Sequence, residues 1–373
     1  MEIKNRYGAL VTLHTFQSSG MEIGNKNMGD YIQTIAGMQY FPQIDEYVER
    51  EAISSFRPID DTQKVKVIMN AWWMWNPENW PPSCFINPLP VSMHLSLLHA
   101  DEMLSGTGLQ WFKEHEPIGC RDKGTVQLLQ SQGIESYFSG CLTLTLGRKY
   151  MPLSSEKRSG ICFTDPYIIV PNKLIKKLCA FTHFFVAPQT IYILSKKAFF
   201  SRSSYNNSHP FRKYRYLKTL MMATLFHKQY ATFFSDSVLR SSEYITHIKI
   251  LRRGVDTNET LIHEADKMLK YYQTCKLVVT SRIHAALPCL ALETPVIFVQ
   301  SAKMREEIMN INRLDGLINL FRCMQVSDNG LSTTDTVLTK IRRVGENFPI
   351  FLNKEDWKPI AENLKKICEK FAE

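Results

Sequence analysis

The segment LVVTSRIHAALPCLALETPVIFV, from Leu277 to Val299, decides the expected fold. The apolar run Lys276–Thr280 is typical of a buried parallel strand, and residues Ser281–His284 form a turn where a helix should begin. The helix is predicted to reach about Leu292, and Val296–Val299 then reads as a second strand. Because a strand, a helix and a strand follow one another without a break, the segment predicts a βαβ unit and hence an α/β fold.

The rest of the chain shows the same alternation of short apolar runs with segments of helical period. Further strands are predicted at Tyr7–Leu13, Val65–Met69, Val91–Leu95, Pro117–Cys120, Ile161–Phe163, Phe184–Val186 and Tyr244–Ile248. The polar stretch Pro171–Lys177 is a plausible crossing between two halves. We therefore expect a first domain over residues 1–172 and a second over residues 173–345.

The last residues, 346–373, contain an apolar stripe at helical spacing, which predicts a helix that docks back on the domains. Its members are Trp357, Ile360, Leu364, Ile367 and Phe371.

Composition places few limits on function. The 373 residues are 44% hydrophobic and 22% charged, as in an ordinary globular chain, and the formal net charge of +9 suggests an anionic ligand or surface. The nine cysteines form no C-x-x-C pair and no cluster of zinc spacing, so we interpret them as reduced packing residues. The first residues read as a strand rather than a signal peptide, and no apolar run approaches the roughly 20 residues that span a bilayer. A cytoplasmic protein is expected.

Polar side chains follow the strand of the deciding segment at its carboxyl end, where open α/β sheets bind ligands. The following helix starts with unpaired N–H groups that favour an anion, and Arg282 adds a guanidinium fork for carboxylate or phosphate. His284 could transfer a proton near neutral pH. An equally plausible interpretation is that Arg282 pairs with a structural carboxylate and His284 bonds to a backbone carbonyl.

Two more segments place polar residues between a strand and a helix. In GNKNMGDYIQ, from Gly24, Gly29 permits close backbone approach and Asp30 is either the helix N-cap or a catalytic carboxylate. In PIGCRDKGTVQLLQSQG, from Pro117, the strand delivers Arg121 and Asp122 to the start of a helix. Arg121 and Asp122 could instead form a structural ion pair with each other.

In order and spacing, these three segments resemble the polysaccharide pyruvyltransferases. The resemblance runs from about residue 7 to about residue 300 and is weakest between Thr190 and Ser241. It implies two Rossmann-like domains facing each other across a cleft, as in GT-B glycosyltransferases. It also implies transfer of a pyruvyl group from phosphoenolpyruvate to a sugar as a ketal, with no cofactor and no metal.

The resemblance also implies roles for single residues. His284 would donate a proton and Asp30, from the facing domain, would accept one, while Arg282, Ser281 and Ile283 bind phosphoenolpyruvate. Arg121 would hold the departing phosphate. Further residues expected near the cleft are Asn27, Gly29, Asn70, Asp122 and His247. One departure is Glu293, which stands where the family often has a small residue or glycine.

The acceptor sugar is expected to be free or linked to a polyprenyl diphosphate. The stretch Lys196–Lys218 interleaves basic and aromatic residues, which favours contact with an anionic membrane over nucleic acid. NAWWMWNPENW, from Asn70, offers tryptophans that could stack on sugars, although at least half of them are expected in the core. Two alternatives stay open, a nucleotide-sugar glycosyltransferase and a non-catalytic polysaccharide-assembly protein.

Overall fold

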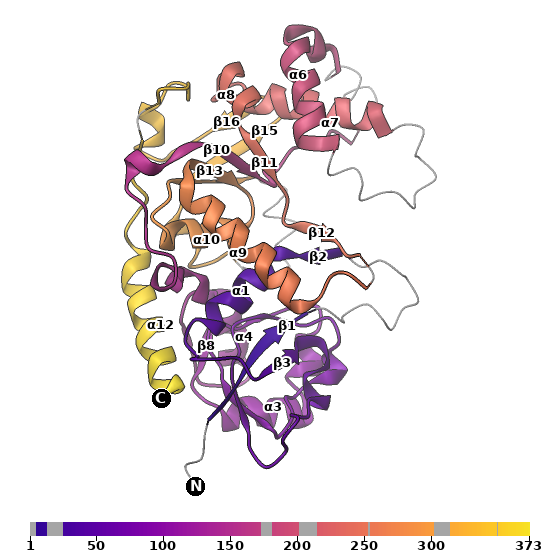
Figure 1. The fold of residues 1–373 in the computed structure, drawn as a ribbon, viewed down its shortest axis with the longest axis vertical. Coiled ribbons are helices and arrows are strands. Elements are labelled where there is room, and N and C mark those ends of the chain that lie inside the picture. Colours follow the sequence, from indigo (N-terminus) through magenta and orange to yellow (C-terminus); the bar gives the residue numbers. More distant parts are fainter. Residues whose placement is uncertain are drawn as a thin grey trace.

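The computed structural model describes residues 5–12, 25–172, 181–200, 215–252, 254–301, 314–348 and 350–373. It confirms a mixed α/β fold with parallel sheets (Figure 1). The first sheet has four parallel strands in the order β3-β1-β4-β6. These are β1 (Arg6–Val11), β3 (Glu46–Glu49), β4 (Val65–Ile68) and β6 (Ile86–Leu89).

The second sheet has six strands in the order β11-β10-β13-β14-β15-β16, of which only β16 runs antiparallel to its neighbour. They are β10 (Ser159–Thr164), β11 (Glu243–Ile245), β13 (Cys275–Thr280), β14 (Val296–Gln300), β15 (Arg322–Ser327) and β16 (Gly330–Ser332). Strands β13 and β14 lie side by side in parallel and are joined by α10 (Ile283–Ala291). The βαβ unit predicted from the deciding segment is therefore confirmed.

Three short strand pairs complete the sheets. They are β5 (Trp72–Trp73) with β7 (His94–Leu95), β8 (Ile118–Cys120) with β9 (Ser136–Phe138), and β2 (Asn25–Asn27) with β12 (Ile248–Ile250). The β2–β12 pair is antiparallel and joins segments more than 200 residues apart. It therefore ties the start of α1 (Met28–Met38) to the second half of the chain.

Helices α1, α10 and α9 (Asn258–Thr274) lie between the two main sheets (Figure 1). Their apolar faces share one core, to which Ile32, Leu269 and Leu287 each contribute a buried side chain. The remaining helices are α2 (Ala100–Met103), α3 (Gly106–Glu114), α4 (Lys123–Ser131), α6 (Pro188–Leu194), α7 (Arg215–Tyr230), α8 (Asp236–Ser241) and α12 (Trp357–Ala372). The halves are thus packed together through helices rather than only linked by the chain.

Helix α12 packs along the first half of the protein, as predicted (Figure 1). Trp357 and Leu364 of the predicted stripe are buried. The Arg148 Nε atom lies 3.3 Å from a Glu369 carboxylate oxygen, and the Tyr7 hydroxyl donates to the carbonyl of Ala372 at 3.4 Å. The chain end therefore closes over the sheet that the chain start forms.

Some strand predictions were wrong. Phe184–Val186 lies in a 3-10 helix (Thr182–Val186), because a three-residue apolar run does not distinguish a strand from a helix. The strand predicted at Ile161–Phe163 pairs in the second sheet, although it precedes the expected boundary after residue 172. Tyr244–Ile248 divides between β11 and β12, and only His94 and Leu95 of Val91–Leu95 form a strand. The domain bounds themselves stay a prediction.

The end of α10 explains the departure at Glu293. Its φ of 53° lies in the left-handed region that glycine adopts without strain, just after the helix C-cap at Leu292. Pro288 lies inside α10, and the helix continues past it to Ala291.

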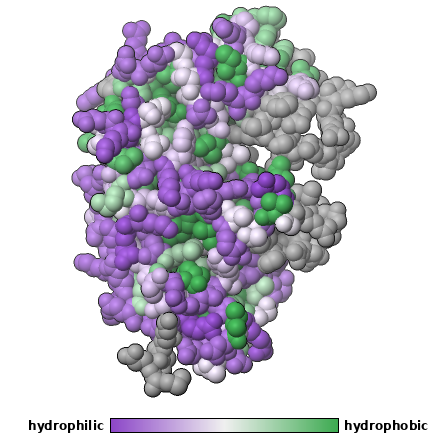
Figure 2. Space-filling model, viewed as in Figure 1, coloured by the Kyte–Doolittle hydropathy of each residue, from purple (hydrophilic) through white to green (hydrophobic). Residues whose placement is uncertain are grey.

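The face shown in Figure 2 is largely hydrophilic, with small separate hydrophobic patches. Within the described ranges, no helix combines the length and apolar character that a membrane crossing needs. Eight of the nine cysteines lie in these ranges, and all eight are free thiols.

Candidate active site

The starts of helices α1 and α10 meet between the sheets. A Cβ atom built on Gly29 would lie 3.0 Å from both the Cβ and Nδ1 atoms of His284. Gly29 therefore lets the two helices approach more closely than any other residue would. Asn27 is the N-cap of α1, and its Oδ1 atom accepts from the Gly29 N–H at 3.1 Å. The expectation that Asp30 is the cap was thus wrong, and Asp30 lies in the first turn.

The second half of the chain holds this helix start in place. The N–H of Met28 donates to the carbonyl of His247 at 2.7 Å, next to the β2–β12 pair. The N–H of His247 in turn donates to Asp165 Oδ2 at 2.8 Å. Asp165 follows β10 and has a φ of 41°, a conformation that is uncommon outside glycine.

Asp165 also fixes Arg282, the N-cap residue of α10. The Arg282 Nε atom donates to the same Asp165 Oδ2 at 3.1 Å, and the Arg282 N–H donates to Thr280 Oγ1 at 2.9 Å. The Arg282 side chain is 38% exposed, and its two terminal nitrogens have no protein partner among the described residues. The predicted structural pair is therefore real, and it leaves the outer edge of the guanidinium for an anion.

Sequence reasoning missed Asp165. The signal was present, because this aspartate directly follows a predicted strand at a sheet's carboxyl end. It was hidden by the assignment of that strand to the first domain, which separated it from Arg282.

Ser281 and His247 have structural contacts. The Ser281 hydroxyl donates to the carbonyl of Val299 at 2.5 Å and accepts from the N–H of Tyr167 at 2.8 Å. His247 is completely buried, with Nε2 2.9 Å from the Tyr272 hydroxyl. Burial, together with the Arg282 charge, lowers the pKa of His247 to about 4 despite Asp165 nearby. His247 is therefore neutral at pH 7 and does not line an open cleft. Ile283, the other predicted residue of this segment, is the first residue of α10 and follows Arg282 directly.

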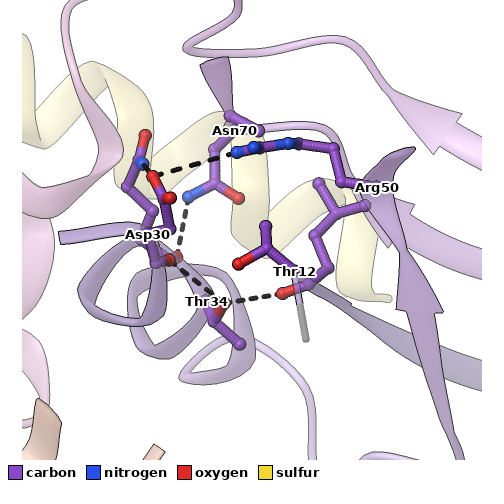
Figure 3. A pocket seen from close by; sticks show the side chains of 8 residues that line it. Thr12, Asp30, Thr34, Arg50 and Asn70 are labelled. Atoms are coloured by element: carbon purple, nitrogen blue, oxygen red, sulfur yellow. Dashed lines mark hydrogen bonds and ion pairs between the residues drawn. The ribbon is translucent and has the colours of Figure 1, made fainter. Parts of the chain in front are cut away.

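A small pocket lies at the carboxyl ends of β1 and β4 (Figure 3). It is lined by Leu10, Thr12, Asp30, Gln33, Thr34, Arg50, Asn70 and Ala71. Asp30 and Asn70, both predicted near the cleft, face this space together, and the Asn70 amide donates to the carbonyl of Gln33 at 2.9 Å. The structure thus brings two predicted site residues into one pocket.

The Asp30 carboxylate has a perturbed environment. Burial raises its pKa above the ordinary value, while the charges of Arg50, Lys26 and Arg121 oppose the shift. An Asp30 oxygen lies 3.8 Å from an Arg50 terminal nitrogen and 3.4 Å from the Gln33 amide nitrogen. A carboxylate with a raised pKa is a better proton acceptor than an exposed one.

Arg50 and Lys26 were not predicted. Arg50 follows β3, whose sequence EYVE is too polar to read as a buried strand. Lys26 lies inside the quoted GNKNMGD segment, is buried, and donates to the carbonyl of Thr12. Burial lowers the pKa of Lys26 to about 8, and the neighbouring Arg50 adds to the shift.

Arg121 and Asp122 do not form a close, hydrogen-bonded ion pair. Arg121 is 2% exposed, and its Nε atom lies 3.8 Å from Asp122 without a hydrogen-bond partner in the described ranges. Asp122 caps α4 through the Thr125 N–H at 2.9 Å and lies 2.6 Å from His94 Nδ1. Burial raises the pKa of Asp122, but His94 and the hydrogen bonds outweigh burial and hold it below the usual value. Asp122 is therefore a buried helix cap, whereas Arg121 contributes positive charge near Asp30.

The described residues contain no group of three His, Cys, Asp or Glu side chains arranged for a metal ion.

Comparison with known proteins agrees with the resemblance of the three segments. The family model for polysaccharide pyruvyl transferase matches residues 109–301, which is more than half of the chain. The protein belongs to the polysaccharide pyruvyl transferase family and is a transferase of that class. No curated protein and no solved structure matches the chain.

Proposed function

We propose that this protein transfers the pyruvyl group of phosphoenolpyruvate to a sugar of a cell-surface polysaccharide or its precursor, forming a pyruvate ketal. The observation that carries the proposal is the contact between Gly29 and His284. In this contact the start of α10, with Arg282 and His284, lies close to the turn that holds Asp30, which supports the proposal. A GT-B-like arrangement of two Rossmann-like domains is part of the proposal.

The residues divide the reaction between them. Phosphoenolpyruvate carries a carboxylate and a phosphate, which fit the Arg282 guanidinium, the N–H groups at Ile283 and His284, and Arg121. His284 donates a proton to the enol CH2 group, which leaves a cationic carbon at C2. A sugar hydroxyl adds there and gives its proton to Asp30. The C2–O bond to phosphate then breaks and inorganic phosphate departs. A second hydroxyl adds at C2 to close the ketal and gives its proton to the His284 imidazole, which is restored to its starting state.

The proposed reaction needs neither a cofactor nor a divalent metal, because arginine side chains and helix N–H groups neutralise the anion. We expect the purified protein to release phosphate from phosphoenolpyruvate when a suitable lipid-linked or nitrophenyl sugar is present. The sugar should gain the mass of a pyruvyl ketal, and EDTA should leave the rate unchanged.

The same experiment separates the alternatives. A nucleotide-sugar glycosyltransferase would instead bind a nucleotide diphosphate saturably, and an assembly protein would bind sugar without turnover. Activity that EDTA abolishes and Mg²⁺ restores would contradict the metal-free mechanism. Phosphate release without any mass gain on the sugar would contradict pyruvyl transfer.

We also propose that the protein works at the inner face of a membrane, on a polyprenyl-diphosphate-linked acceptor. Between Asp165 and Asp236 the sequence has eleven lysines and arginines and no acidic residue, which exceeds the whole formal net charge of +9. Residues 201–214 of the basic stretch Lys196–Lys218 lie outside the described residues. In its described part, Lys196 lies 5.5 Å and 5.6 Å from the rings of Tyr192 and Tyr216, both more than half exposed.

Such a surface attracts anionic lipid by about 1 kcal/mol per basic residue, and salt weakens the attraction. We expect co-sedimentation with vesicles containing phosphatidylglycerol at low ionic strength, fading as salt rises. Changing both Lys196 and Lys218 to glutamine should weaken it. Lys365→Gln on α12 is the matched control, because it removes a positive charge elsewhere. Equal binding to neutral and anionic vesicles would refute this part of the proposal.

A further inference from the structure

The six tryptophans of the sequence do not share one environment. Trp73 and Trp80 belong to the core, with ring centroids 5.2 Å apart and exposures of 0% and 7%. Trp75 is 53% exposed, and its ring lies 4.7 Å from the ring of the half-buried Trp72. We call Trp72 and Trp75 the tryptophan pair. It presents an aromatic surface to solvent that the core does not use.

A buried glutamate fixes the turn that carries the tryptophan pair. Glu51 is 2% exposed, and one of its carboxylate oxygens accepts from the N–H groups of Trp75 and Asn76 at 2.8 Å and 3.1 Å. The other oxygen accepts from Arg50 Nε at 3.0 Å and lies 2.9 Å from an Arg50 terminal nitrogen. The turn is therefore held rigidly against Arg50, which pre-organises the exposed ring.

Arg50 links the tryptophan pair to the pocket at Asp30. Its guanidinium carbon lies 5.5 Å from the Trp72 ring centre, and a terminal nitrogen of the same group lies 3.8 Å from Asp30. In Figure 3 the Arg50 guanidinium extends across the pocket toward Asp30. The tryptophan pair and the proposed proton acceptor are thus linked through one buried arginine.

We propose that the tryptophan pair is the platform on which the acceptor sugar stacks, with its reacting hydroxyls directed toward Asp30. This inference rests on the proposed pyruvyl transfer. An aromatic face accepts the C–H face of a pyranose ring, and the pocket to which Arg50 links the tryptophan pair is lined by hydroxyl, amide, carboxylate and guanidinium groups.

The test uses methyl glycosides of glucose, galactose, mannose and N-acetylglucosamine, whose binding is measured by ligand-observed saturation-transfer NMR without phosphoenolpyruvate. Trp75→Ala is expected to weaken binding of the preferred glycoside by about 2- to 12-fold, the range of an aromatic contact. Trp75→Phe should restore most of the affinity. Tyr192→Ala is the matched control, because Tyr192 is a similarly exposed aromatic residue, at 58%, on α6, a helix that packs on the second sheet.

Steady-state kinetics distinguish the platform from the reaction itself. In Trp75→Ala the KM for the acceptor should rise, while kcat and the KM for phosphoenolpyruvate stay as in the wild type. Turnover with an unchanged acceptor KM would overturn the platform and leave pyruvyl transfer standing. If the protein bound the glycoside through Trp75 but showed no turnover, pyruvyl transfer would be overturned and the platform would stand. No saturable binding of any glycoside to the wild type also overturns the platform.

Discussion

Replacing His284 by alanine should lower kcat by about 10²- to 10⁴-fold, the usual contribution of a general acid. Binding of phosphoenolpyruvate should change little, because the proposed anion contacts come from Arg282 and the backbone N–H groups of α10 rather than from the imidazole. His284 is buried at the first turn of α10, so the unfolding midpoint of the variant is compared with that of the wild type alongside the kinetics. Single-turnover rates and the dissociation constant for phosphoenolpyruvate measure the two effects separately.

His263→Ala is the matched control, because His263 is an exposed histidine on α9 that has no role in the proposed mechanism. It should leave every constant unchanged. Added imidazole should restore part of the activity of His284→Ala if proton transfer is what the variant lost. A variant with the wild-type kcat would remove His284 from the mechanism, whatever its effect on stability.

The sequence was most informative where local signals agree. The βαβ unit from β13 to β14 was predicted because apolar strands, a turn with Thr294 and Pro295, and a helical period all point to the same structure. A helix start close to Gly29 was also predicted, although its cap is Asn27 rather than Asp30. In these segments the local sequence decides the structure.

Other features depend on contacts between distant parts of the chain. Asp165 lies 117 positions from Arg282, and Asp122 lies 28 positions from His94, so neither partner follows from spacing. Strand β3 was missed because its half-buried edge position tolerates the charged ends of EYVE. Missing β3 also hid Arg50, and with it the link between the Asp30 pocket and the tryptophan pair.

The second large effect is expected from Arg282→Lys. Lysine keeps the positive charge, but an ammonium group cannot pair with Asp165 and also present a planar edge to a carboxylate or phosphate. Loss of one charge-assisted contact costs about 1.5–3 kcal/mol, so the KM for phosphoenolpyruvate should rise roughly 10- to 150-fold. The value of kcat should fall much less, because the proton-transfer groups at His284 and Asp30 stay in place.

Arg322→Lys is the control. It separates the effect of weakening an arginine–aspartate ion pair from the effect of removing a contact to phosphoenolpyruvate. Arg322 also pairs with an aspartate, Asp335 at 3.0 Å, but it starts β15 at the opposite end of the parallel strands from Arg282. It should change stability without changing the KM for phosphoenolpyruvate. If Arg282→Lys kept the wild-type KM, the exposed edge of this guanidinium would have no part in donor binding. Because Asp165 holds Arg282 through Nε alone, we expect that edge to be where the anion is bound.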